Sequence, residues 1–195
     1  MAEKKVLVLC STGKMGKGVA RGLKDSGLDV YGTTRTAKSG AALTKYGIKP
    51  IVANYIVRAD VDRALKESGA SVLVMMTDYF LAAKSSVKRE AEQGAMMVDA
   101  AKAAGVEFIV FLSVGDAETL DPAVKPNKVL HFHAKLLVER HLRASGVNFA
   151  IMRPVCFFEN LDDAVNYNPL KKGSLKFLIL PDCSFSWIGT YDLGV

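Results

Sequence analysis

The fold is decided near the amino terminus, where residues 5–18 read KVLVLCSTGKMGKG. The first six of these residues are almost wholly apolar, which is typical of a buried strand. Gly13 and Gly16 occupy the second and third positions of a glycine fingerprint, and Cys10 or Ser11 stands in place of the first glycine. The pattern predicts a turn that binds a phosphate through its backbone N–H groups and the following helix. The alternative is an ordinary strand–helix turn.

The rest of the chain repeats this alternation of strand and helix. Further strands are expected at residues 29–34, 49–53, 71–77, 107–113 and 148–153, and helices at residues 15–26, 37–46, 58–68, 83–104 and 129–145. Strands that alternate with helices at this spacing predict an α/β protein of the Rossmann type, with a doubly wound parallel sheet. We expect this domain to span residues 1–153 and to bind its ligand beyond the carboxyl ends of the strands.

Length, charge and cysteine content limit the class of protein. The 195 residues suffice for one domain and the start of a second. No apolar run approaches the ~20 residues of a membrane span, and the first residues leave no room for a signal peptide, so no membrane contact is expected. Three cysteines are too few for a disulfide framework and favour a reducing, cytoplasmic location. The net charge of +6 comes from scattered basic residues, which argues against nucleic-acid binding.

The residues after the second strand favour NADP(H) over NAD(H). NAD-selective sites carry an acid here, which accepts hydrogen bonds from the ribose 2′-hydroxyl. In this chain Arg35 takes that position, with Thr36 and Lys38 beside it. A guanidinium forms paired hydrogen bonds with a 2′-phosphate, whereas an acid repels it. The alternative is a solvated arginine in a polar loop.

A partial catalytic set of the short-chain reductases begins after the fifth strand. Such enzymes use a serine after this strand and a Tyr-x-x-x-Lys pair on one helix face, where the lysine lowers the pKa of the tyrosine. Ser113 and Lys135 occupy the serine and lysine positions, but His131 stands where the tyrosine belongs. Residues four apart share a helix face, so His131 is a candidate proton donor. The other interpretation is a site without its acid, in which Lys135 remains as a contact of the cofactor ribose.

Two further chemistries find little support in the sequence. His131 and His133 diverge on a helix, and no nearby acid or cysteine completes a metal site, so no metal is expected. Cys10 lies near a helix N-terminus, a position that lowers a thiol pKa. We nevertheless favour its interpretation as a small buried residue.

The glycine turn, Arg35 and two later segments together resemble the NmrA-like family, an atypical branch of the short-chain dehydrogenases. These segments read HFHAK at residues 131–135 and RPVCFFENL at residues 153–161. The resemblance runs from residue 4 to the last residue, and within the family it is closest to a subgroup of NADPH-sensing redox regulators. The cofactor contacts implied by the fingerprint and the resemblance are Cys10, Ser11, Thr12, Gly13, Lys14, Met15, Gly16, Arg35, Thr36, Lys38, Asn54, Tyr55, Thr77, Asp78, Tyr79, Lys135, Phe157, Phe158, Glu159 and Asn160.

The sequence departs from the family at two of the positions that the resemblance aligns. Asn54 stands where the family commonly has Asp, and Glu92 stands where the sensor subgroup can place a lysine on the long helix. The family also implies that residues 154–195 begin a smaller C-terminal α/β substrate domain, apparently truncated. That domain would contain a strand at residues 176–180 and a segment from residue 184 that returns to the sheet.

The resemblance implies one of two functions. The first is an NADP(H)-binding, redox-sensing regulator with little or no turnover, whose cofactor state alters association with a partner protein or a second copy. The alternative is an NADPH-dependent reductase of a quinone or small carbonyl compound. We favour the first, because an intact cofactor site lies beside a degraded acid site.

Overall fold

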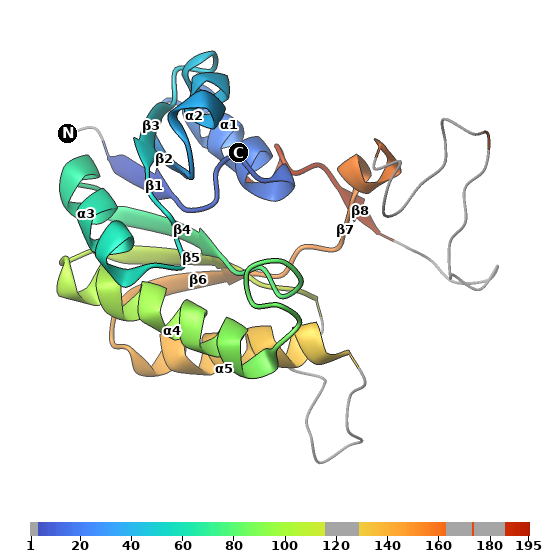
Figure 1. Cartoon of the computed structure of the whole chain (residues 1–195). Coiled ribbons are helices and arrows are strands. Elements are labelled where there is room, and N and C mark those ends of the chain that lie inside the picture. Colours follow the sequence, from blue (N-terminus) through green and yellow to red (C-terminus); the bar gives the residue numbers. More distant parts are fainter. Residues whose placement is uncertain (1–3, 116–128, 163–172, 174–185) are drawn as a thin grey trace.

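The computed structural model describes residues 4–115, 129–162, 173 and 186–195 (Figure 1). Within them, parallel strands form the main sheet in the order β3-β2-β1-β4-β5-β6. Their bounds are β1 Lys5–Val8, β2 Asp29–Thr34, β3 Lys49–Val52, β4 Val72–Met76, β5 Phe108–Leu112 and β6 Asn148–Met152. The chain winds outward from β1 to β3 and then from β4 to β6, so the winding direction reverses between β1 and β4. This order confirms the predicted Rossmann-type sheet.

Helices cover both faces of this sheet (Figure 1). Their bounds are α1 Lys14–Asp25, α2 Ala37–Thr44, α3 Arg58–Ser68, α4 Val87–Ala103 and α5 Leu130–Ala144. On one face, Val19 of α1 and Leu43 of α2 share a buried apolar cluster with Val8 of β1. On the other, residues of α3, α4 and α5 pack around Phe111 of β5. The central strand β4 is wholly apolar because a parallel sheet is covered on both faces.

The predicted element bounds agree with the structure to within two residues at every element except α4. This helix was expected from residue 83 but begins at Val87. Lys84 and Ser85 have φ values of 51° and 54°, in the left-handed region that an α-helix does not contain. Ser86 then caps α4, since its side chain accepts a hydrogen bond from the backbone N–H of Arg89 at 3.3 Å.

The C-terminal residues return to the Rossmann domain and pack on α1. Strand β7 (Cys156–Phe157) pairs in parallel with β8 (Trp187–Ile188), and a 3-10 helix, η1 (Phe158–Asp162), follows β7. After β8 the chain runs so close to α1 that a Cβ at Gly18 would collide with Thr190. Leu193 is 8% exposed and joins the apolar cluster under α1. The strand expected at residues 176–180 lies outside the described residues.

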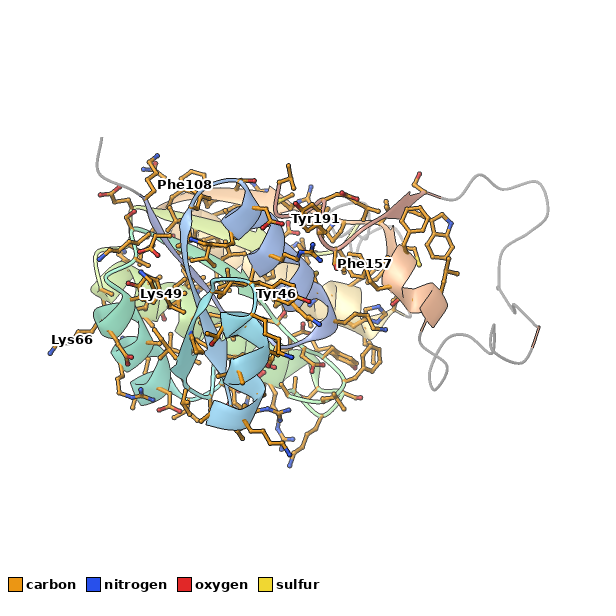
Figure 2. The ribbon with its side chains drawn as sticks, turned by 90° about the horizontal axis from the view of Figure 1, so that it is seen from above. Tyr46, Lys49, Lys66, Phe108, Phe157 and Tyr191 are labelled. Atoms are coloured by element: carbon orange, nitrogen blue, oxygen red, sulfur yellow. The ribbon has the colours of Figure 1, made fainter. Side chains whose placement is uncertain are left out.

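Aromatic contacts reinforce this docking from the solvent side of α1. The guanidinium of Arg21 lies 5.1 Å from the ring centre of Tyr46 and 5.4 Å from that of Tyr191. Figure 2 shows both tyrosines beside α1. The hydroxyl of Tyr191 also donates a hydrogen bond to Asp25 at 3.0 Å. Residues 190–194 therefore form a strap across α1, and we call them the C-terminal strap.

Candidate functional site

The turn between β1 and α1 is held in one conformation by its own backbone and by β2. The N–H of Cys10 donates to the hydroxyl of Thr33 at 3.0 Å, and the hydroxyl of Ser11 donates to the Thr33 carbonyl at 2.9 Å. Cys10 has a φ of 56°, the left-handed conformation that favours glycine. The sequence left Cys10 and Ser11 as alternatives for the first fingerprint position, and Cys10 is the one with glycine-like geometry.

Of the two glycines of the turn, Gly16 leaves no room for a side chain and Gly13 leaves little. A Cβ at Gly16 would collide with the carbonyl oxygen of Cys10, and one at Gly13 would lie 3.2 Å from the Cys10 sulfur. Gly13 is the N-cap of α1 and offers no capping side chain, and the first turn of the helix holds no acid. The first N–H groups of α1 are therefore available to an anion. Thr12 and Lys14 are exposed beside them, and Met15 is half-buried.

The loop after β2 presents two cations from a rigid base. The side chain of Thr36 caps α2 by accepting from the Ser39 N–H at 3.2 Å, and the hydroxyls of Thr36 and Ser39 lie 2.7 Å apart. Arg35, Thr36 and Lys38 are all exposed. Arg35 follows the end of β2, the strand that pairs with β1, and its charge acts on the Cys10 thiol. The loop thus presents a guanidinium at the same edge of the sheet as the turn, and its binding of a 2′-phosphate stays a prediction.

Buried polar groups follow β3 and β4 at the same edge of the sheet. Tyr55 is buried and hydrogen-bonded to Cys10, and burial raises the pKa of both side chains. The thiol of Cys10, which is half-buried, therefore stays protonated, and this argues against a reactive cysteine. Asn54 donates its N–H to Asp60 at 2.8 Å, and Asp78 accepts from the backbone N–H groups after it.

Lys135 makes a buried ion pair at the end of β4. Its Nζ lies 2.7 Å from Oε1 of Glu90, 2.9 Å from the hydroxyl of Thr77 and 3.0 Å from the Thr77 carbonyl oxygen. Glu90 is fully buried in the first turn of α4. The lysine that was predicted to meet the cofactor ribose therefore binds protein groups in this structure. Sequence reasoning missed Glu90 and singled out Glu92 instead, which is exposed and lies 3.8 Å from Lys88.

Ser113 is held in the same way one strand further along. Its hydroxyl donates to Oε1 of Glu139 at 2.5 Å. Glu139 is fully buried on α5 and also accepts from Nε of Arg153 at 3.1 Å and from its Nη2 at 2.5 Å. The serine predicted to orient a substrate thus donates a hydrogen bond to a buried carboxylate. The position of Glu139 one helical turn after Lys135 was a signal in the sequence that this residue lies on the same face of the helix.

His131 lies among aromatic rings one turn before Lys135. Its ring centre is 5.4 Å from that of Phe80, 5.9 Å from that of Tyr79 and 4.6 Å from that of Phe132. Burial, and then the positive charge of Lys135, lower the pKa of His131 below its usual range. The imidazole is therefore neutral at neutral pH, which is unfavourable for a general acid.

Residues 157–160 connect the phosphate turn to the C-terminal strap. Nζ of Lys14 donates to the side-chain oxygen of Asn160 at 3.4 Å. Glu159 accepts from the N–H of Thr190 at 2.8 Å and from its hydroxyl at 2.6 Å. Although burial opposes it, these two hydrogen bonds hold the pKa of Glu159 below its usual range. Phe157 packs on the core, and Phe158 stacks on Trp187 with ring centres 5.7 Å apart. Figure 2 shows Phe157 on the strap side of the molecule.

No helix in the described ranges has the length and apolar character that a membrane span requires. No group of three or more His, Cys, Asp or Glu side chains there is arranged to hold a metal ion.

Comparisons with known proteins agree with this geometry. Quinone oxidoreductase QOR2 from Escherichia coli, solved as a complex with NADPH, is 26% identical with a TM-score of 0.64 over 82% of this chain and 52% of that one. The triphenylmethane reductase of Citrobacter sp., solved with NADP(H), shares the fold at 19% identity, with a TM-score of 0.66 over 80% of this chain and 50% of that one.

Among curated proteins, the photosystem II assembly factor Ycf39 of Cyanophora paradoxa is 25% identical over 166 residues, or 80% of this chain and 46% of that protein. The chain thus spans about half the length of these relatives. The sequence profile of the NmrA-like family matches residues 2–182. This match covers nearly the whole chain, and the chain therefore belongs to the NmrA-like family.

Proposed function

We propose that this chain binds NADP(H) at the carboxyl ends of β1, β2 and β4. The observation that carries the proposal is the exposed Arg35 at the end of β2, next to the strand whose following turn leads into a helix without a side-chain cap. The pyrophosphate would lie on the turn, where Gly13 and Gly16 keep the backbone accessible. The 2′-phosphate would lie at Arg35, with Lys38 adding charge. The NADPH complex of the related quinone oxidoreductase supports this choice of cofactor.

The remaining predicted contacts would surround the rest of the cofactor. Asn54 and Tyr55 follow β3 on the adenine side, and Asp78 follows β4 at the point where the winding direction reverses. Residues 157–160 reach the turn through the contact between Lys14 and Asn160. This contact supports a position of residues 157–160 beside the turn, where they would meet the cofactor.

The cofactor site serves, in this proposal, a redox sensor with little or no turnover. Two members of the partial catalytic set bind buried carboxylates, since Ser113 bonds to Glu139 and Lys135 to Glu90. The third, His131, is neutral and therefore a poor acid. The link from Glu159 to Thr190 offers a route by which the nicotinamide end would act on the C-terminal strap. A partner protein or a second copy that contacts the strap would then respond to the state of the cofactor.

A reductase is the second candidate, and the aromatic surroundings of His131 favour it. Phe80, whose ring contacts that histidine, is 62% exposed and the next residue, Leu81, is 83% exposed, which gives an apolar surface suited to a quinone or another small carbonyl compound. Bound NADPH would supply a hydride, and His131 would give a proton only from its protonated form, which its lowered pKa disfavours. Oxidation of NADPH against a panel of quinones and aldehydes decides between the two. Turnover that is lost in His131→Ala would establish the reductase and refute the sensor.

Calorimetric titration with NADPH and NADH tests the cofactor site itself. Arg35→Ala is expected to weaken NADPH binding about 10- to 100-fold, because hydrogen bonds to a charged group contribute about 1.5–3 kcal/mol. NADH binding should change far less, since NADH carries no 2′-phosphate. Arg140→Ala, an exposed arginine on α5, is the matched control. Equal losses for both nucleotides, or no binding of NADPH by the wild type, would overturn the proposal.

A further inference from the structure

The buried ammonium of Lys135 uses all three of its hydrogen-bond donors. A lysine ammonium carries three N–H donors. In this structure the three acceptors are Oε1 of Glu90, the hydroxyl of Thr77 and the carbonyl oxygen of Thr77, all at 2.7–3.0 Å. The Lys135 side chain is 10% exposed, so water does not replace any of these partners readily. A new acceptor at Nζ therefore has to displace one of the three.

Glu90 holds the lysine more tightly than either group of Thr77. Its side chain is 0% exposed, and its Oε1 accepts from both Lys135 and the hydroxyl of Thr77, the latter at 2.5 Å. Its Oε2 is buried and has no hydrogen-bond partner in the described part of the chain. Withdrawal of Lys135 would leave a buried carboxylate without a cation, which is strongly unfavourable. The charge-assisted bond to Glu90 is about twice as strong as a neutral one.

We propose that Glu90 is a positioning residue that competes with the cofactor for Lys135. The inference rests on the proposed NADP(H) site, in which Lys135 is the residue that would meet the nicotinamide ribose. A ribose hydroxyl would have to draw Nζ out of this arrangement, and the bond to Glu90 is the strongest one that opposes the movement. Glu90 thus reduces the affinity at the nicotinamide end while the adenosine end, held at Arg35, is unaffected. The first turn of α4 becomes the element that sets how firmly the second half of the dinucleotide binds.

Glu90→Gln separates this role from a purely structural one. The substitution keeps the shape and one acceptor but removes the charge, so Lys135 is released more easily. NADPH should bind about fivefold more tightly, the difference between a hydrogen bond to a charged group and one to a neutral group. The adenosine fragment 2′-phosphoadenosine 5′-diphosphate lacks the nicotinamide ribose, and its affinity should not change. Glu92→Gln, the same chemical change two residues along α4 at an exposed position, should alter neither ligand.

The titration of His131 by NMR provides a second readout without the cofactor. Among the residues that the structure describes, Lys135 and Glu90 are the charged groups that act on this histidine, and the rings of Tyr79, Phe80 and Phe132 lie around it. The carboxylate of Glu90 opposes the effects of burial and of Lys135. Its removal should lower the pKa of His131 further. An unchanged His131 titration would show that Glu90 does not act on this end of the site.

Each binding result has a definite meaning. Equal changes for NADPH and the fragment, unchanged NADPH affinity, or weaker NADPH binding by Glu90→Gln would each overturn the competition. Absence of binding of both ligands to the wild type would instead refute the cofactor site on which it rests. If circular dichroism shows that Glu90→Gln does not fold, Glu90→Asp replaces it, because the shorter side chain draws the carboxylate away from Lys135. A smaller gain in NADPH affinity is then expected, and no gain would again overturn the proposal.

Discussion

Substitution of Cys10 by glycine and by alanine tests the backbone geometry of the phosphate turn. Cys10 has a φ of 56°, where a residue with a Cβ is strained by about 1–2 kcal/mol and glycine is not. Glycine loses about 0.5–1 kcal/mol more backbone entropy on folding than alanine does. The two effects oppose each other, and the strain is the larger. Cys10→Gly should therefore be more stable than Cys10→Ala by about 0.5–1 kcal/mol.

This order is the reverse of that at an ordinary helical site. Ala20 is fully buried in the middle of α1, and Ala20→Gly should lower the free energy of unfolding by about 1 kcal/mol. Urea unfolding followed by far-UV circular dichroism gives all the differences on one scale. Because both variants at position 10 lack the thiol, its contact with Tyr55 cancels in the comparison. If Cys10→Ala is as stable as Cys10→Gly or more so, the strain argument is wrong.

Three further predictions concern the ion pairs, the strap and pH. Arg153→Met should destabilise the protein by about 3 kcal/mol because the buried Glu139 loses the nearer of its two cations and keeps only the half-exposed Arg143 at 3.9 Å, whereas Arg58→Met, which breaks an exposed pair with Asp62, should cost less than about 1 kcal/mol. Gly18→Ala should displace the C-terminal strap, and chymotrypsin should then cleave after Tyr191 faster than in the wild type. Folding lowers the pKa of His131, so protonation favours the unfolded chain and this contribution to stability is lost as the pH falls through the ordinary histidine range. His131→Gln should therefore reduce the difference in urea midpoint between about pH 7.5 and about pH 5.5, while a difference as large as the wild type's would contradict the lowered pKa.

The sheet and its helices were predictable because their signals are local. A strand such as β4 is apolar throughout, and a helix such as α1 repeats apolar residues every four positions, so a stretch of about a dozen residues predicts each element. The start of α4 was not predictable in this way. Its residues 83–86 suit a helix, but the N–H of Ala83 bonds to the carbonyl of Asp78 and that of Ser85 bonds to the carbonyl of Tyr79. These bonds close a loop with left-handed residues before the helix begins.

The partners of the site residues were harder to predict than the residues themselves. Arg35 and Lys135 follow from position alone, since each lies at a fixed place relative to a strand or a helix. Glu90 lies 45 residues before Lys135, and an acid in the first turn of a helix is usually solvated and interacts with the helix dipole. Only the packing of α4 against α5 buries it, where Gly94 lets the two helices approach until a Cβ would strike Val138. The ion pair between Glu90 and Lys135 therefore cannot be predicted from a local sequence pattern.

Helix α5 joins the ends of three strands through side chains spaced one turn apart. Lys135 bonds to Thr77 after β4, and Glu139, four residues later, bonds to Ser113 after β5 and to Arg153 after β6. Because both side chains are buried and charged, each fixes its strand end more rigidly than an apolar contact would. A cofactor that draws Lys135 from Glu90 would therefore release the bond between α5 and α4 and leave the bonds of Glu139 to Ser113 and Arg153 intact. Movement at the nicotinamide end would then be confined to the β4–α4 loop, which carries the exposed Phe80 and Leu81, while the sheet beneath keeps its geometry.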